Sequence, residues 1–164
     1  MKIALLVIDM QKIFLEEQMK ELKVERACEY INYVGNLLRS HNHLVVHVKD
    51  VESANEDNEQ LLDFISEVYV DPSDKIVTKE FSNSFWKTNL EEILNEHNVG
   101  LVIVAGFAAE HCVLFTYNGA NERGFKSVIL QNGIVGERPS SVEFIYQDRN
   151  LISHPVISYL VSHS

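Results

Sequence analysis

Apolar residues along the chain gather in short runs that alternate with longer segments of helical periodicity. The runs rich in valine, isoleucine or leucine predict strands at residues 3–8, 43–48, 75–79, 99–105, 126–130 and 155–161. The clearest helical pattern lies at 24–39, where apolar residues recur at steps of three and four. Further helices are predicted at 57–68, where the pattern is weaker, and at 89–97, 110–122 and 141–148.

Strands that alternate with helices are typical of βαβ units, whose connections return each strand to the same end of the sheet. The chain has 164 residues, which suits one domain, and it shows no repeat and no linker-like tract. We therefore expect a single α/β domain over residues 1–164. Its six strands are predicted to form a mostly parallel sheet with helices on both faces.

Charge and cysteine content narrow the possible partners and the compartment. The formal net charge is −10, which repels nucleic acid and anionic membrane surfaces, so a small molecule is the expected partner. Only two cysteines occur, Cys28 and Cys112, which favours a reducing compartment over a disulfide framework. The first strand is neither a signal peptide nor long enough to span a membrane, so we expect a cytoplasmic protein.

Three residues whose side chains could take part in catalysis follow or end predicted strands. Asp9 comes directly after the first strand, Lys79 ends the third, and Cys112 lies just beyond the fourth. Ligands of parallel α/β sheets bind at the carboxyl ends of the strands, so we expect these side chains to meet there. Burying a carboxylate at the end of an apolar strand costs free energy unless the carboxylate has a partner or a role. Lys79 would be a partner for Asp9, and the thiol of Cys112 would give it a role.

These residues predict a cysteine nucleophile with a base and a cation. Asp9 would take the proton of Cys112, the sulfur would attack a carbonyl, and Asp9 would return the proton to the departing nitrogen. Lys79 would hold the charges together, and the start of the following helix would favour thiolate. The backbone N–H groups of Ala108 and Cys112 are placed to stabilise the oxyanion.

Three motifs together resemble the isochorismatase-like cysteine hydrolases, the superfamily of nicotinamidase and N-carbamoylsarcosine amidase. They are Leu6-Val7-Ile8-Asp9-Met10-Gln11 with Phe14, Lys79 to Phe85 with Thr88 and Leu90, and Gly106 to Val113. Their order and spacing agree over nearly the whole chain.

The resemblance implies a three-layer sandwich with Asp9, Lys79 and Cys112 as the catalytic triad. It also implies a cis peptide bond between Phe107 and Ala108. Relatives of this kind are commonly dimers or tetramers, so a homo-oligomer is expected. Phe14 and Trp86 lie close to catalytic segments and are candidate substrate-binding residues.

Departures from the family pattern bear on cofactors and on turnover. Many members have threonine where this chain has Ala109, so a hydroxyl near the oxyanion turn is missing. Metal-dependent nicotinamidases have an Asp-x-His pair after the second strand, whereas this chain reads Asp50-Val51-Glu52. His43 and His47 would lie about 13 Å apart on one strand, too far to share an ion. We therefore expect neither a metal nor another cofactor.

The sequence thus predicts a cysteine-dependent hydrolase of a small amide or carbamoyl C–N bond. One alternative is hydrolysis of a vinyl ether, as in isochorismatase itself, although relatives with that activity typically lack cysteine at the nucleophile position. Another is a catalytically silent binding or scaffold protein with the same fold. The substrate itself depends on loop conformations that the sequence does not determine.

Overall fold

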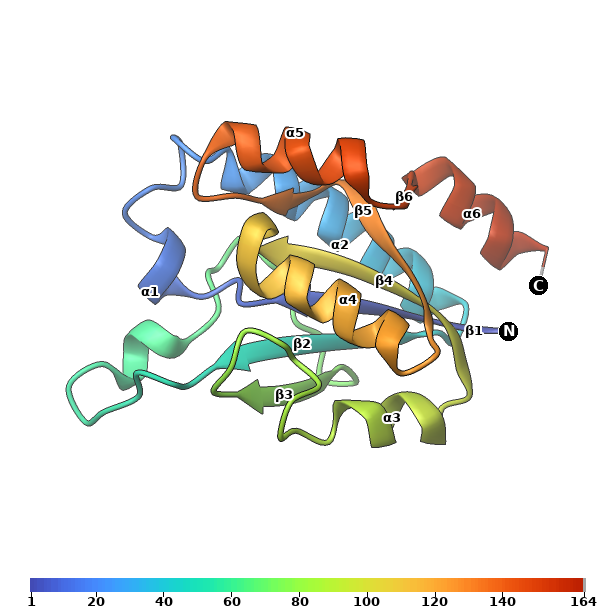
Figure 1. Ribbon diagram of the computed structural model, residues 1–164, viewed down its shortest axis with the longest axis horizontal. Helices are drawn as coiled ribbons and strands as arrows, with labels where there is room; N and C mark the ends of the chain where they lie inside the picture. Colours follow the sequence, from blue (N-terminus) through green and yellow to red (C-terminus); the bar gives the residue numbers. More distant parts are fainter. Residues whose placement is uncertain (164) are drawn as a thin grey trace.

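The computed structural model describes residues 1–163 and consists of one parallel sheet between layers of helices (Figure 1). The strands are β1 (Lys2–Ile8), β2 (Leu44–Asp50), β3 (Lys75–Lys79), β4 (Val99–Phe107), β5 (Lys126–Val135) and β6 (Leu151–Ile152). The helices are α1 (Lys12–Leu15), α2 (Val24–Ser40), the 3₁₀ helix η1 (Glu59–Leu62), α3 (Leu90–Glu96), the π-helix η2 (Ala109–Val113), α4 (Leu114–Glu122), α5 (Pro139–Asp148) and α6 (His154–Ser162).

The six strands lie in the order β3-β2-β1-β4-β5-β6, and every neighbouring pair is parallel. The expected six-stranded parallel sheet is therefore confirmed. β1 lies in the interior of the sheet, and all but one of its residues are buried, as its unbroken apolar run requires. Because the strands are parallel, their carboxyl ends meet at one edge.

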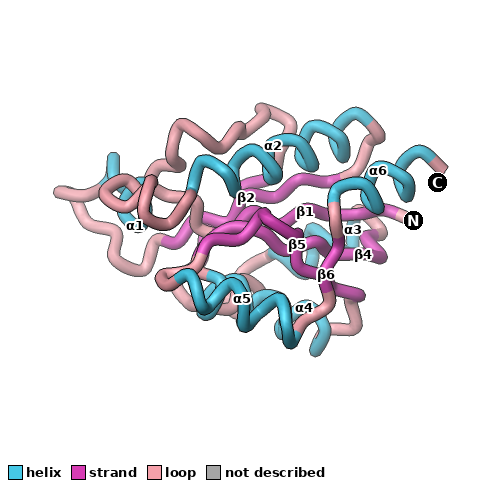
Figure 2. The backbone as a smooth tube through the Cα atoms, turned by 90° about the horizontal axis from the view of Figure 1, so that it is seen from above, coloured by secondary structure: helices cyan, strands magenta, loops and turns pink. Residues whose placement is uncertain are grey.

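Helices cover both faces of the sheet, which gives the expected three layers (Figure 2). One layer contains α2 and α6, whose buried side chains join alternate residues of β1, such as Leu5 and Val7. The other contains α3, α4 and α5, and it packs against the opposite set, such as Leu6 and Ile8. Alternation of side chains along β1 thus divides the core into two halves.

The prediction of a strand at 155–161 is wrong, because this segment lies within helix α6. The sixth strand is the two-residue β6 just before it. Pro155 lies in the first turn of α6. The N–H groups of a first turn have no partner within the helix, so the N–H group that proline lacks costs no helical hydrogen bond. Ile157 and Val161 are spaced by four residues and are both buried in the half-core shared with α2, a spacing that suits a helix.

Two other predicted helices differ from the structure at particular turns. The segment 57–68 forms only η1, and Phe64 instead pairs with Gln11 in an isolated antiparallel bridge. The predicted helix at 110–122 begins with the wider π-helix η2 before it continues as α4. Among the described residues, no helix combines the length and the apolar character that crossing a membrane requires.

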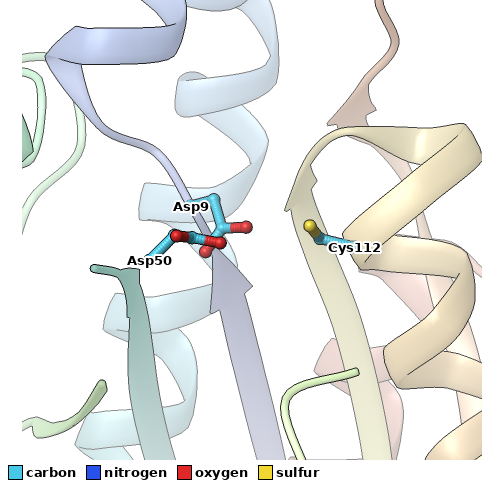
Figure 3. Close-up of side chains that lie close together, drawn as sticks. All are labelled: Asp9, Asp50 and Cys112. Carbon is cyan, nitrogen blue, oxygen red and sulfur yellow. The ribbon is translucent and has the colours of Figure 1, made fainter. Parts of the chain in front are cut away.

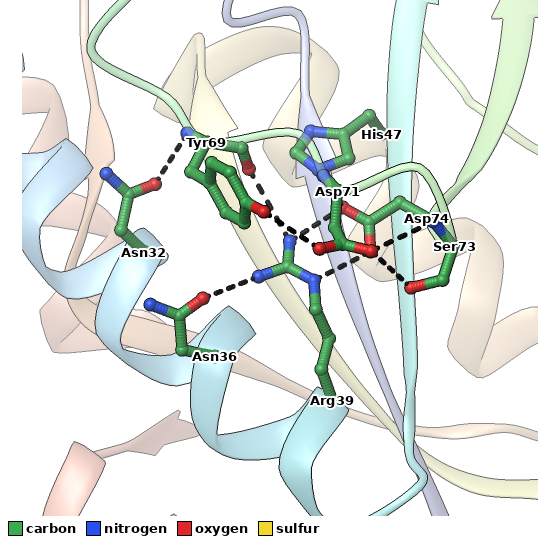
Figure 4. Close-up of polar contacts among 8 residues, drawn as sticks. All are labelled: Asn32, Asn36, Arg39, His47, Tyr69, Asp71, Ser73 and Asp74. Carbon is green, nitrogen blue, oxygen red and sulfur yellow. Dashed lines mark hydrogen bonds and ion pairs between the residues drawn. The ribbon is translucent and has the colours of Figure 1, made fainter.

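A buried polar network fastens the connection between β2 and β3 to the neighbouring helix (Figure 4). Arg39 of α2 donates two hydrogen bonds to the carboxylate of Asp74, at 2.6 and 2.8 Å. His47 of β2 lies with its Nε2 atom 3.0 Å from the same carboxylate, and the backbone N–H of Asp71 also donates to it. His47 is therefore a buried histidine whose contact with Asp74 supports the fold.

Candidate active site

Four ionisable side chains from four separate segments meet at the carboxyl edge of the sheet. Asp9 follows β1, Asp50 ends β2, Lys79 ends β3, and Cys112 lies in η2 just after β4. Figure 3 shows the carboxylates of Asp9 and Asp50 side by side, with Cys112 across from them at the start of the helical segment. The structure thus brings together the three residues that the sequence singled out and adds Asp50.

Lys79 lies at the centre of this cluster. Its Nζ atom is 2.9 Å from Asp9 Oδ2, 2.6 Å from Asp50 Oδ2 and 3.5 Å from Cys112 Sγ. Its side chain is completely buried. Burial alone would lower the pKa of this ammonium group, but the attraction of Asp9 and Cys112 and the hydrogen bond to Asp50 raise it. Lys79 is therefore a permanent cation at neutral pH.

Asp9 is a buried carboxylate with the properties of a base. Burial raises its pKa from 3.8 to about 6, and the charge of Lys79 limits the increase. One of its oxygens, Oδ1, has no hydrogen-bond partner among the described residues. The carboxylates of Asp9 and Asp50 and the sulfur of Cys112 offer atoms within 4.8 Å of one another. Asp9 can therefore be ionised at neutral pH while one oxygen stays available for a proton.

The Cys112 thiol differs from the thiolate that we expected at a helix start. Burial and the negative charge of Asp9 raise its pKa to about 12, although Lys79 acts in the opposite direction. Cys112 also lies inside the π-helix rather than at the first N–H groups of a regular helix. The resting group is consequently a neutral thiol, and a nucleophilic sulfur requires a base that removes the proton during attack.

Close contact between β1 and β4 sets the distance between the segments that hold Asp9 and Cys112. Gly106 of β4 pairs with Ile8, and a Cβ atom at Gly106 would come within 2.2 Å of the Ile8 carbonyl oxygen. Gly106 also has a φ of 106°, which glycine adopts without strain. Asp9 itself has a φ of 48°, an unusual conformation for a residue with a side chain. Both features lie where the chain enters the site.

The turn after β4 places backbone groups beside the thiol. The peptide bond between Phe107 and Ala108 is cis. The carbonyl oxygen of Ala108 accepts hydrogen bonds from the N–H groups of His111 and Val113, at 3.0 and 3.1 Å, which close the π-helical turn around Cys112. Ala109 is fully buried. The suggested oxyanion donors, Ala108 and Cys112, thus belong to one compact turn.

The two aromatic residues suggested for substrate binding occupy different surroundings. Trp86 is 52% exposed and lines a cavity of about 280 Å³ that also borders Lys79. The other lining residues are Val51, Thr78, Glu80, Phe81 and Lys87. Phe14 packs instead against Phe107, with ring centroids 6.0 Å apart. Their role in binding a substrate stays a prediction.

Sequence reasoning missed two residues that shape the site, Asp50 and Gln11. Gln11 is fully buried, and its side-chain amide bonds both the N–H and the carbonyl of Asp50. The signal for Asp50 was a carboxylate two residues beyond the predicted strand 43–48. Gln11 belongs to the first motif, but its position did not reveal its role, because its partners are distant backbone groups.

The donor atoms of this cluster do not fit a metal ion. Asp9, Asp50 and Cys112 lie close enough to share one, but the ammonium of Lys79 already contacts both carboxylates and provides the positive charge. A divalent ion on the same atoms would be repelled by this lysine, and the thiol is protonated at neutral pH. We therefore assign no metal ion to these atoms.

Comparison with known proteins shows where this fold and sequence recur. Residues 3–153 match the isochorismatase domain family. The isochorismatase family protein YrdC of Bacillus subtilis is 28% identical over 138 residues, which cover 80% of this chain and 72% of that protein.

Among solved structures, an isochorismatase-like hydrolase from Alkaliphilus metalliredigens superposes with a TM-score of 0.82 at 20% identity, covering 99% of both chains. N-carbamoylsarcosine amidase from Thermoplasma acidophilum gives a TM-score of 0.77 at 21% identity, covering 90% of this chain and 92% of that one. These structural likenesses describe the fold, and the family match covers nearly the whole sequence. The chain belongs to the isochorismatase family.

Proposed function

We propose that this protein hydrolyses the C–N bond of a small amide or carbamoyl compound through an acyl-thioester on Cys112. The observation that carries the proposal is the position of Lys79 Nζ, 2.9 Å from a buried carboxylate and 3.5 Å from a thiol at the carboxyl edge of the sheet. Membership of a hydrolase family and a fold shared with an amidase support it.

In the first half of the reaction, Asp9 accepts the thiol proton while the sulfur of Cys112 bonds to the substrate carbonyl carbon. The carbonyl oxygen gains negative charge, which the N–H groups of Ala108 and Cys112 would stabilise. The C–N bond then breaks, and the proton on Asp9 passes to the departing nitrogen. The products of this half are an amine or ammonia and an acyl-thioester.

In the second half, water attacks the thioester carbon and gives one proton to Asp9. The C–S bond breaks, the acid leaves, and the proton returns from Asp9 to the sulfur. Lys79 keeps its proton throughout and stabilises whichever neighbour carries the negative charge. A carboxylate whose pKa is about 6 suits both directions of proton transfer near neutral pH.

The test is ammonia release from a panel of small amides, ureas and carbamoyl compounds, including nicotinamide. We expect release by the wild-type protein and a loss of at least about a thousandfold in Cys112→Ala and Lys79→Ala, because nucleophile and cation act as one unit. Cys28→Ala is the matched control, since it removes the other cysteine, which is buried in α2. It should retain activity.

Three outcomes would contradict this function. Ammonia release that persists in Cys112→Ala would exclude a thioester on Cys112. Hydrolysis of isochorismate that persists in Cys112→Ala, without ammonia release from the panel, would favour the vinyl-ether alternative. Silence of the wild-type protein across both substrate classes, together with a Cys112 that reacts with iodoacetamide no faster than a free thiol, would favour a binding protein that keeps the fold.

The assembly and the compartment are further expectations of the same proposal. We expect a cytoplasmic homo-oligomer, either a dimer or a tetramer. Light scattering after size-exclusion chromatography would measure the molar mass, and a molar mass equal to that of one chain would contradict the oligomer. Fractionation of cells that produce the protein would test the compartment.

A further inference from the structure

Asp50 makes the shortest contact of the central lysine, although it lies outside the predicted triad. Asp50 and Lys79 are direct partners in the register between β2 and β3, so their side chains leave the sheet on the same face. The backbone confirms this pairing, because the N–H of Val51 donates to the carbonyl of Lys79 at 2.8 Å. The distance from Lys79 Nζ is 2.6 Å to Asp50 and 2.9 Å to Asp9.

The carboxylate of Asp50 is itself held in place. The buried amide of Gln11 accepts a hydrogen bond from the Asp50 N–H at 2.7 Å and donates to its carbonyl at 2.9 Å. The same amide donates to the carbonyl of Leu62 at 2.8 Å. One carboxylate oxygen of Asp50 accepts the N–H of Glu52, which leaves the other for Lys79. Because each oxygen has a partner, the orientation of the Asp50 carboxylate is fixed.

The charges of the cluster change unequally during the proposed reaction. Among the described residues, the ionisable groups that act on Asp9 are Lys79 from β3, Asp50 from β2 and Cys112 from η2. When Asp9 accepts the thiol proton it becomes neutral, and its attraction for Lys79 falls. Asp50 keeps its charge in this step, because the proton moves only between Cys112 and Asp9. Lys79 therefore retains one anionic partner while the sulfur loses its proton.

We propose that Asp50 is a positioning residue that anchors the Lys79 ammonium beside the sulfur and strengthens Asp9 as a base by adding a second negative charge to the same lysine. This inference rests on the proposed function, because it assigns Asp9 as the acceptor of the thiol proton. The repulsion between two carboxylates that share one cation is one cause that raises the pKa of Asp9.

The experiment follows alkylation of Cys112 by iodoacetamide against pH, with the full chain and without any substrate. Mass spectrometry of the peptide that contains Cys112 separates this reaction from any at Cys28. In the wild-type protein the rate should rise through about pH 6 to a plateau, as Asp9 becomes able to accept the proton. Asp9→Asn should abolish this rise and thereby assign it to Asp9.

Asp50→Asn should move the midpoint of the rise to lower pH by about one unit, because removing a nearby negative charge weakens Asp9 as a base. Asp50→Glu restores the charge and should bring the midpoint back toward the wild-type value. Asp63→Asn is the matched control, since Asp63 also pairs with a lysine, Lys49 at 3.4 Å, but is largely exposed. Its profile should coincide with that of the wild-type protein.

A folded Asp50→Asn variant with the wild-type midpoint would overturn the inference, as would Asp50→Glu behaving like Asp50→Asn. If Asp50→Asn does not fold, Asp50→Ser tests the same loss of charge with a smaller side chain. The two proposals fail separately, because alkylation needs no substrate. A shifted midpoint without any hydrolysis would contradict only the proposed function, and Cys112-dependent hydrolysis without a shift would contradict only the role of Asp50.

Discussion

Asp9 illustrates how a single residue can serve chemistry at the expense of stability. Its carboxylate is buried, its φ is 48°, and one of its oxygens has no hydrogen-bond partner among the described residues. Each of these properties raises the free energy of the folded state. Each also leaves a base with one free oxygen beside a thiol.

The raised pKa of Asp9 predicts a stability that depends on pH. The folded protein binds the Asp9 proton more tightly than the unfolded chain does. The contribution of this proton to the free energy of unfolding is therefore complete below pH 3.8 and is lost as pH rises through about 6. The Asp9→Asn side chain has no proton to lose. From pH 4 to pH 8 the free energy of unfolding of this variant should therefore rise by up to about 3 kcal/mol relative to that of the wild-type protein. Urea unfolding at both pH values measures this difference.

The exposed carboxylate of Asp63 provides the control for that measurement. Asp63→Asn should stay within about 0.5 kcal/mol of the wild-type protein at both pH values, as surface substitutions usually do. A constant difference between Asp9→Asn and the wild-type protein across this range would show that the Asp9 carboxyl titrates normally.

At the scale of single residues, the sequence predicted which side chains meet, but it did not predict their protonation states. Asp9, Lys79 and Cys112 were identifiable because each follows or ends an apolar run. Asp50 was missed because β2 continues two residues beyond the predicted strand, and only the register with β3 places Asp50 opposite Lys79. The raised pKa of Cys112 follows from burial and from Asp9, neither of which the neighbouring sequence contains.

Between elements, the approach of β1 to β4 depends on one glycine. Gly106→Ala would place a Cβ atom 2.2 Å from the Ile8 carbonyl oxygen, so the two strands must separate next to Asp9. We expect a loss of about 3 kcal/mol or more in the free energy of unfolding, since the contact is with rigid backbone and φ is positive. Chemical denaturation followed by circular dichroism measures it.

Gly124→Ala is the control for that substitution. Gly124 also has a positive φ, 85°, but a Cβ atom there would meet nothing within 4 Å. Its replacement should therefore report backbone strain alone, about 1 kcal/mol. Equal losses in the two variants would mean that the contact between β1 and β4 adds nothing to the effect of φ.

Element predictions succeeded where the periodicity was long and failed where it was short. The pattern at 24–39 matched α2 within one residue at its C-terminal end, because several turns of one apolar face leave little ambiguity. The apolar run at 155–161 is compatible with either a strand or a helix, and packing against α2 decides in favour of α6. The π-helix η2, with which the predicted helix 110–122 begins, depends on the tertiary position of the turn after β4, which no local pattern encodes.

At the scale of the whole molecule, the network around Asp74 joins the helical layer to the sheet. Burial alone would raise the pKa of Asp74, but hydrogen bonds with His47 and Arg39 lower it to about 2. Arg39→Met removes the positive charge beside the buried carboxylate of Asp74. We therefore expect the free energy of unfolding to fall by about 3 kcal/mol at pH 7. Urea unfolding checks the value.

A more exposed ion pair elsewhere in the fold provides the comparison. Arg123 of the α4–β5 turn lies 3.0 Å from Glu91, and both side chains are partly exposed, so Arg123→Met should cost less than about 1 kcal/mol. Asp74 stabilises the fold above pH 3.8, and this contribution is lost as pH falls through about 2. Arg39→Met should therefore also unfold at a higher pH in an acid titration, and an unchanged acid midpoint would show that the pair is energetically neutral.

The strand order has a consequence for how the molecule is made. Residues 2–8 are synthesised before the rest of the sheet, yet they form an interior strand whose two neighbours are β2 and β4. Ile8 pairs with Gly106, so one edge of this apolar strand stays unpaired until well over half of the chain has been synthesised. Nascent chains that stop before β4 would expose that edge to one another and would depend on chaperones, whereas pairing with β4 conceals it.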